Sequence, residues 1–308
     1  MTELRPIRGD DEAVGAVPLT ADEGGFWVQA DLSDAGFRHL ATLLGDRPDA
    51  WLSLSIHGMT DLACLAHVPG LRRLVVTSLR LRSWDGIGHV AGSLEHLAMG
   101  DTTLRPVSIA PIGELTRLRS LGLAGPVRDA EVISRLENIG ELSLRSVTLA
   151  SLEPLLPMHR LRSLWIGLGG TADLDLLPKF ASLEELELWR IRGLSDLTVL
   201  GALATVRTLR VQSMSAVTSL PSLAGMTALR TLALESMKGI TDLAPIAEAR
   251  GLEELFLVDM PQLDAGSLRP LVGHPTLRRG IWGFGSTRRN AAAYELLPLG
   301  DPPYGSPG

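Results

Sequence analysis

Residues 183–200 read LEELELWRIRGLSDLTVL, a stretch in which leucine returns at fixed intervals. The first half has the pattern L-x-x-L-x-L, with Leu183, Leu186 and Leu188 at positions one, four and six. Alternation of polar and apolar residues over positions three to six is typical of a short β-strand with one buried face. The second half, Leu194-Ser-Asp-Leu197, contains an aspartate that can cap a helical turn. The stretch therefore predicts one short strand followed by one tight helical or 3-10 return.

The same pattern recurs along most of the chain, with successive first positions 20 to 25 residues apart. No single unit of this size can bury its own leucines, so the units must stack and share one continuous core. Eleven copies of the pattern can be aligned, and the last of them has Gly280 and Trp282 in place of the usual residues at positions four and six. They begin at Trp51, Leu71, Leu94, Leu118, Ile139, Leu161, Leu183, Val206, Leu229, Leu252 and Leu277.

These repeats resemble the leucine-rich-repeat family, and their length and the segment Ile240-Thr-Asp-Leu243 are similar to the bacterial, internalin-like variety. The resemblance implies an α/β fold: a curved right-handed solenoid of about 11 repeats, with a concave parallel β-sheet and short helical or 3-10 returns on the convex side. It also implies an asparagine at position nine of each repeat, where the side chain bonds the backbone of the turn. That asparagine ladder is absent here, and the residues at position nine are mostly apolar: Leu79, Val147, Ile191, Met214, Met237 and Met260.

The two open ends of such a stack need covers. Residues 33–45, SDAGFRHLATLLG, predict one amphipathic helix with Ser33 or Asp34 as its cap and Gly45 as its end. We expect this helix to cover the first repeat, and Trp282 or Phe284 to cover the last leucines. The expected organisation is a mobile segment at 1–24, an N-terminal cap at 25–50, the solenoid at 51–284 and a disordered tail at 285–308.

Composition bounds the partner and the compartment. The chain has 308 residues and a net charge of −6, which argues against a nucleic-acid-binding surface or a polybasic membrane patch. We find neither an apolar leader nor a membrane-spanning run, so the cytoplasm is the expected location. Cys64 is the one cysteine, which excludes an internal disulfide and a metal site built from several cysteines. The oligomeric state is left open.

A candidate binding surface follows from the alternation of strand residues. Positions three, five and seven should project from the concave sheet, which places Trp165 and Trp189 on neighbouring strands. Tryptophan and arginine are the residues that most often anchor protein interfaces. We therefore predict that repeats five to ten bind a protein or peptide partner. The predicted contact residues are Trp165, Trp189, Arg145, Glu187, Arg190, Arg210, Glu235 and Phe256.

Structural interpretations of the same residues remain open. The two tryptophans can simply cover a wide sheet face, or belong to the core if the register slips by one residue. Glu187 and Arg210 can form an exposed lateral pair of little energetic value. The methionines at position nine are expected to pack the turns rather than to bind a ligand.

The sequence lacks the common motifs for catalysis or cofactor binding. The sequence has no phosphate-binding loop, dinucleotide fingerprint, zinc-protease motif, serine-hydrolase motif or CxxC pair, and its histidines show no ligand spacing. Cys64 falls in a return segment, where a buried small residue is expected. We therefore predict a non-enzymatic scaffold without a cofactor or metal. A regulatory, sensor or inhibitor subunit for an enzyme or ATPase on another chain is the alternative, and an enzyme with an unrecognised site is a remote one.

Overall fold

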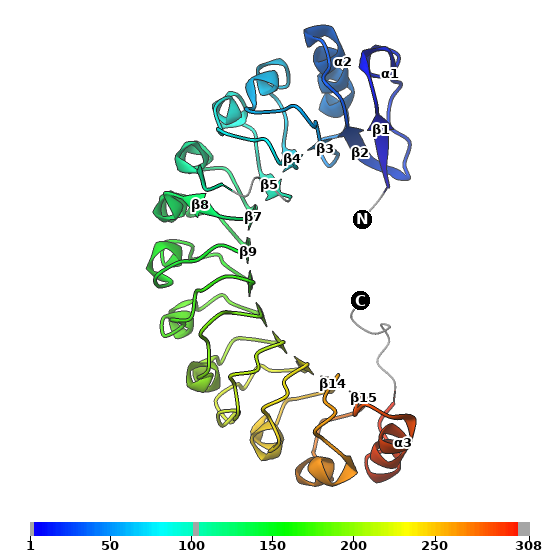
Figure 1. Cartoon of the computed structure of the whole chain (residues 1–308), viewed down its shortest axis with the longest axis vertical. Helices are drawn as coiled ribbons and strands as arrows, with labels where there is room; N and C mark the ends of the chain where they lie inside the picture. The colour runs from blue at the N-terminus through cyan, green and yellow to red at the C-terminus, as the bar shows by residue number, and fades with distance from the viewer. Residues whose placement is uncertain (1–2, 101–104, 301–308) are drawn as a thin grey trace. The chain divides into compact units, whose positions relative to one another are not determined.

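A computed structural model describes residues 3–100 and 105–300. The chain forms two compact units, one made of Met1–Val147 with Pro154–Arg160 and the other of Thr148–Glu153 with Leu161–Gly308. Within each unit, successive repeats contribute one short strand to the inner side of the curve and one return to the outer side (Figure 1).

The inner side of the first unit is a parallel sheet in which strands follow one another in chain order. A two-stranded parallel pair, β6 with β8, lies outside this sheet. The strands of the main sheet are β1 (Glu3–Ile7), β2 (Glu23–Val28), β3 (Trp51–Leu54), β4 (Arg73–Val76), β5 (His96–Met99), β7 (Ser120–Ala124) and β9 (Glu141–Arg145). The additional pair consists of β6 (Val107–Ser108) and β8 (Val127–Arg128).

The second unit repeats this arrangement with strands in strict register, so that equivalent repeat positions lie side by side. Its strands are β10 (Ser163–Gly167), β11 (Glu185–Trp189), β12 (Thr208–Gln212), β13 (Thr231–Glu235), β14 (Glu254–Val258) and β15 (Arg279–Trp282).

Short 3-10 segments form most of the returns, and α-helices occur only near the two ends of the described chain. The helices are α1 (Asp10–Val14), α2 (Asp34–Gly45) and α3 (Thr287–Leu296). The 3-10 segments are η1 (Ala63–His67), η2 (Ile87–Val90), η3 (Ala110–Glu114), η4 (Ala130–Arg135), η5 (Glu153–Leu155), η6 (Leu177–Lys179), η7 (Thr198–Ala202), η8 (Ala244–Glu248) and η9 (Ala265–Leu271).

The aspartates that precede the returns cap them as the sequence predicted. The Oδ1 atoms of Asp61, Asp196 and Asp242 each accept a hydrogen bond from the backbone N–H two residues later, at 2.8–3.0 Å. A proline stands in the first turn of η3 and of η8, where its missing N–H removes no hydrogen bond. These returns are therefore encoded by nearby residues: an aspartate that caps the N–H of the Ala or Thr two residues later and, in η3 and η8, a proline in the first turn.

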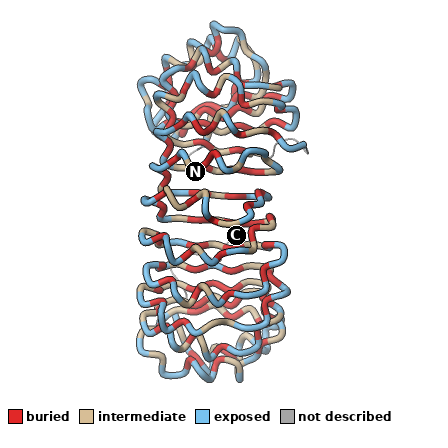
Figure 2. Tube along the Cα trace, turned by 90° about the vertical axis from the view of Figure 1, so that its left-hand side faces the viewer, coloured by how far each residue is buried: buried red, intermediate tan, exposed pale blue. Residues whose placement is uncertain are grey.

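Leucines at positions one, four and six form the core. Leu183, Leu186 and Leu188 are at most 1% exposed, whereas Glu187 and Trp189 between and after them are half-buried on the sheet face. Buried and exposed residues alternate along each turn of chain within each unit (Figure 2). The strand period therefore places positions three, five and seven on the inner face of the sheet, as predicted.

Methionines and left-handed residues replace the asparagine ladder in the second unit. The residue at position eight has a positive φ in successive repeats, for example 57° at Ser213 and 52° at Ser236. This conformation turns its N–H toward the next repeat, so Ser213 and Ser236 donate to the carbonyls of Glu235 and Val258 at 2.8 and 2.9 Å. Position nine then points inward: Met237 and Met260 are fully buried, and the Met237 N–H donates to the Met260 sulfur at 3.2 Å.

The N-terminal region holds more structure than the sequence predicted. Residues 1–24 were expected to be mobile, yet residues 3–7 form β1 and residues 10–14 form α1, and β1 pairs in parallel with β2. Pro6 is compatible with β1 because this strand is the edge of the described sheet, where one side of the backbone needs no partner. The helix predicted at residues 33–45 is α2, and the Ser33 hydroxyl accepts the Gly36 N–H at 3.2 Å.

The register of the first repeat also differs from the prediction. Leu52 and Leu54 pair with Leu74 and Val76, which puts them at positions four and six. Trp51 therefore occupies position three instead of position one, and its indole lies on the sheet face. The predicted register was wrong because Trp51, Leu54 and Ile56 also satisfy the apolar pattern. No earlier copy of the repeat was available to show which residue occupies position one.

Aromatic residues close the C-terminal end of the second unit. Trp282 and Phe284 are both buried and stack with ring centroids 6.4 Å apart, and Tyr294 of α3 lies 6.1 Å from Trp282. The Ser286 hydroxyl caps α3 by accepting the Arg289 N–H at 3.3 Å. The disordered tail predicted for 285–308 is thus wrong for the helical part, and residues 301–308 lie outside the described residues.

Candidate functional site

Two indoles meet on the sheet face of the second unit. Trp165 lies at position five of β10 and Trp189 at position seven of β11, and their ring centroids are 5.8 Å apart with planes inclined by 59°. Both side chains are half-buried, so neither belongs to the core and the register does not slip here. A tilted pair at this separation is a favourable aromatic geometry.

Two neighbours fix the ring of Trp165. Its Nε1 donates to Oε1 of Glu187 at 2.9 Å on the adjacent strand. The ring lies directly over Gly167, because a Cβ built on that glycine would stand 2.4 Å from Cη2 of Trp165. The absence of a side chain at Gly167 therefore leaves the space that the indole of Trp165 occupies next to Trp189. We call Trp165, Gly167, Glu187 and Trp189 the tryptophan patch.

Glu187 and Arg210 are direct lateral neighbours in the register of β11 and β12. Across the part of the chain that the structure describes, they form no ion pair, and Glu187 instead accepts the indole N–H of Trp165. The exposed Arg210 guanidinium is thus left beside the tryptophan patch without a carboxylate partner among these residues.

The remaining predicted contact residues lie at other positions. Glu235 and Phe256 lie on β13 and β14, and Phe256 is four strands from Trp165, or roughly 19 Å at the usual strand spacing. Arg190 follows β11 in the left-handed conformation, with φ 46°, and is exposed. Arg145 is exposed on β9 of the first unit. The structure therefore assembles a compact group from three of the eight predicted residues, with Arg210 beside it.

The first unit carries an aromatic and cationic cluster that the sequence analysis missed. The guanidinium of Arg73 lies 5.6 Å from the ring centroid of Trp51, and the His96 ring meets the same indole edge-on at 5.9 Å. Burial and then the charge of Arg73 lower the pKa of His96. All three residues occupy position three of successive strands. A correct register for the first repeat would have revealed the cluster.

Cys64 lacks the surroundings of a nucleophile. Burial, followed by the charge of Asp61, raises the pKa of its thiol to about 11, whereas a reactive cysteine needs a lowered pKa. Over residues 3–100 and 105–300, no group of three or more His, Cys, Asp or Glu side chains is placed to hold a metal ion. No helix in these same ranges is long and apolar enough to cross a bilayer.

Comparison by sequence identifies no relative: no family model matches the chain, and no curated protein matches it.

Comparison by structure gives a fold. An internalin from Listeria monocytogenes aligns over 99% of this chain and 88% of its own, with a TM-score of 0.50 and 17% identity. An internalin C2 from the same organism aligns over 71% of this chain and 81% of its own, with a TM-score of 0.42 and 20% identity. A leucine-rich-repeat protein from Leptospira interrogans aligns over 96% of this chain and 98% of its own, with a TM-score of 0.46 and 15% identity. With its repeats and the likeness to the first internalin, the chain has the leucine-rich-repeat solenoid fold, in an internalin-like form that lacks the asparagine ladder.

Proposed function

We propose that the chain is a non-enzymatic binding scaffold and that the sheet face of its second unit binds a protein or peptide partner. The observation that carries the proposal is the tryptophan patch: two half-buried indoles held in contact on a solvent-facing sheet. The ring of Trp165 is held by Glu187 and contacts Trp189 in the unbound chain, so less side-chain freedom is lost when a partner covers the pair. Such rigid aromatic groups are typical centres of binding energy.

Charged groups around the tryptophan patch give the proposed contact its polarity. Arg210 lies one strand beyond Glu187, and Glu235 is one strand further along, in line with Trp189 and Gln212. Arg190 is exposed immediately after Trp189. A partner that places an apolar side chain over the indoles therefore meets two guanidinium groups at the edge, which suits a carboxylate or a backbone carbonyl.

The test uses three forms of the full chain as bait: the unaltered protein, the double variant Trp165→Ala with Trp189→Ala, and the control variant Lys179→Ala. Lys179 is exposed on η6, on the outer side of the same unit. We expect one stoichiometric partner to be captured by the unaltered protein and the control and to be lost from the double variant. The purified partner is then titrated against all three baits by calorimetry.

The expected loss of affinity in the double variant is at least about a hundredfold, because each interfacial tryptophan that anchors a contact contributes about 2 kcal/mol or more. Circular dichroism must show that the variant keeps the fold of the unaltered protein. A purified partner that binds the folded double variant with unchanged affinity would contradict the proposal.

A further inference from the structure

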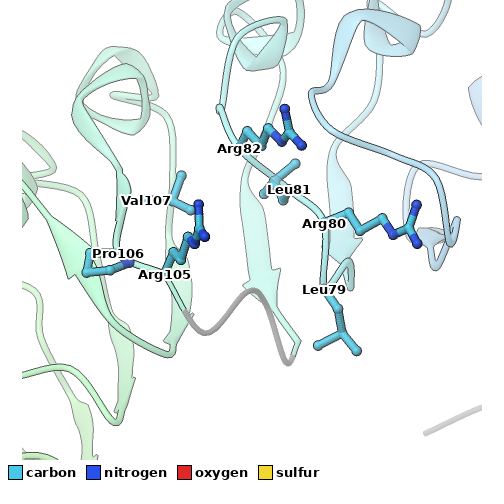
Figure 3. A pocket seen from close by; sticks show the side chains of 7 residues that line it. All are labelled: Leu79, Arg80, Leu81, Arg82, Arg105, Pro106 and Val107. Atoms are coloured by element: carbon cyan, nitrogen blue, oxygen red, sulfur yellow. The ribbon is translucent and has the colours of Figure 1, made fainter.

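A groove opens on the first unit, between the segment after β4 and the segment that leads into β6 (Figure 3). Its volume is about 770 Å³, within the range of roughly 300–1,000 Å³ that is typical of ligand sites. One wall consists of Leu79, Arg80, Leu81 and Arg82, and the other of Arg105, Pro106 and Val107. We call this feature the arginine groove.

The lining of the arginine groove carries three positive charges and, among the described lining residues, no carboxylate. Arg80 and Arg82 are exposed and form no ion pair with another described residue. The sequence has no Asp or Glu between Asp61 and Asp85, although the chain as a whole has a net charge of −6. The described lining is thus cationic on an acidic protein, and it favours an anionic ligand.

The arrangement of the guanidinium groups distinguishes between anions. In Figure 3 the three groups end at separate points around the arginine groove and do not converge on one another. A single phosphate would need them to converge, because a clamp forms when several donors reach the same oxygens. Separated guanidinium groups instead match several anionic groups spread along one extended ligand.

The arginine groove also contains apolar residues, and their type argues against a single-stranded nucleic acid as its ligand. Leu79 is 67% exposed and Pro106 is also exposed, so these two residues supply aliphatic surface, whereas Leu81 and Val107 are buried; the described lining contains no aromatic ring. Single-stranded nucleic acids rely on aromatic side chains against which the bases stack. A peptide that alternates acidic and aliphatic side chains can satisfy both components of the lining.

The backbone of the groove wall also suits an extended peptide. Val107 and Ile109 direct their N–H groups to the carbonyls of Pro126 and Arg128 on the β8 side, at 3.4 and 3.1 Å. In a parallel ladder the residue between two such donors, here Ser108, directs its own backbone groups to the other side of the strand. Among the described residues no backbone hydrogen bond joins 79–82 to 105–107, so β6 has an unpaired edge at the groove. Unpaired edges of this kind accept an added strand.

We propose that the arginine groove is a second binding site, separate from the tryptophan patch, for an extended acidic peptide segment with interspersed aliphatic residues. Arg80 and Arg82 contact its carboxylates, Leu79 and Pro106 contact its apolar side chains, and the free edge of β6 orients its backbone.

The test titrates the full chain into a fluorescein-labelled ten-residue peptide of alternating glutamate and leucine and follows fluorescence anisotropy. The groove variant is Arg80→Glu with Arg82→Glu. The matched control is Arg117→Glu with Arg160→Glu, which makes the same charge change at two exposed arginines of the same unit outside the groove. Circular dichroism verifies that both variants are folded.

We expect the groove variant to bind the peptide at least about tenfold more weakly and the control to stay within about twofold, with binding that weakens as salt is added. The double variant at Trp165 and Trp189 should bind this peptide normally, which separates this site from the proposed partner site. Equal losses in the groove variant and the control would overturn the proposal, as would equally tight binding of a ten-nucleotide single strand. Self-association that requires Arg80 and Arg82 would assign the groove to a second copy of the chain and would likewise overturn it.

Discussion

Gly167→Ala tests the geometry of the tryptophan patch without removing any functional side chain. The new methyl group would lie 2.4 Å from Cη2 and 2.8 Å from Cζ2 of Trp165, whereas ordinary contact begins at 3.4 Å. The backbone of Gly167 does not need glycine, because its φ is not in the left-handed region. The indole must therefore move away from the strand, and this movement separates it from Glu187 and from Trp189.

The expected change in stability follows from what the displaced ring loses. The tilted pair with Trp189 contributes about 0.5–1.5 kcal/mol, and the half-buried hydrogen bond to Glu187 contributes about 1 kcal/mol. Replacement of glycine by alanine returns about 0.4–1 kcal/mol, because it restricts the unfolded chain. We therefore expect the free energy of unfolding to fall by about 1 kcal/mol, with a shift in tryptophan emission as the indole becomes more exposed.

Urea unfolding followed by circular dichroism measures the stability, and emission spectra of the folded proteins report the indole. Gly122→Ala is the control, because its methyl group would lie 3.6 Å from Cα of Ala98, an ordinary contact. This control should be neutral or more stable by up to about 1 kcal/mol. If Gly167→Ala were as stable as Gly122→Ala and had unchanged emission, Trp165 would not lie on Gly167 and the reasoning would be refuted.

Three further predictions concern the turns, the N-terminal edge and the cysteine. Met237 is fully buried in the turn at position nine. Met237→Ala should therefore lower the free energy of unfolding, measured in urea, by about 2–5 kcal/mol, and Met237→Leu should lower it by less than about 1.5 kcal/mol. Equal effects of the two substitutions would contradict the packing role. Hydrogen bonds from Arg5 and from the Thr20 N–H lower the pKa of Glu23 from 4.5 to about 2, so its stabilising effect is full above pH 4.5 and is lost as the pH falls toward 2. Thermal unfolding between these pH values should therefore be less pH-dependent in Glu23→Gln, and an unchanged profile would count against the contact. Burial raises the pKa of Cys64 from 9.0 to about 11, which lowers the thiolate fraction near neutral pH. Alkylation by iodoacetamide should therefore be about tenfold slower than that of an unperturbed thiol and should accelerate up to about pH 11. A rate like that of free cysteine would contradict the burial of the thiol.

The repeat, the strand period and the return can all be predicted from the sequence alone. Leucines such as Leu183, Leu186 and Leu188 recur at a spacing at which only stacked strands can bury them. The aspartate before a return, such as Asp196, accepts a hydrogen bond from the backbone N–H two residues later. The leucine spacing and the aspartate cap are both encoded within about 20 residues. Because the unit recurs along the chain, the same pattern can be recognised several times. For the same reason the faces of Trp165 and Trp189 could be predicted from alternation alone.

Tertiary structure decided what a single copy cannot encode. β1 and β2 form because a neighbouring strand offers them a ladder of hydrogen bonds, although Pro6 in β1 and two adjacent glycines at the start of β2 weaken the local strand signal. The asparagine ladder could be seen to be missing, but its replacement by left-handed residues and buried methionines depends on the bond that each turn makes to the next repeat. The contacts of Trp165 with Glu187 and Trp189 and the separation of the groove walls likewise arise between consecutive repeats, and such contacts have no signature within one repeat.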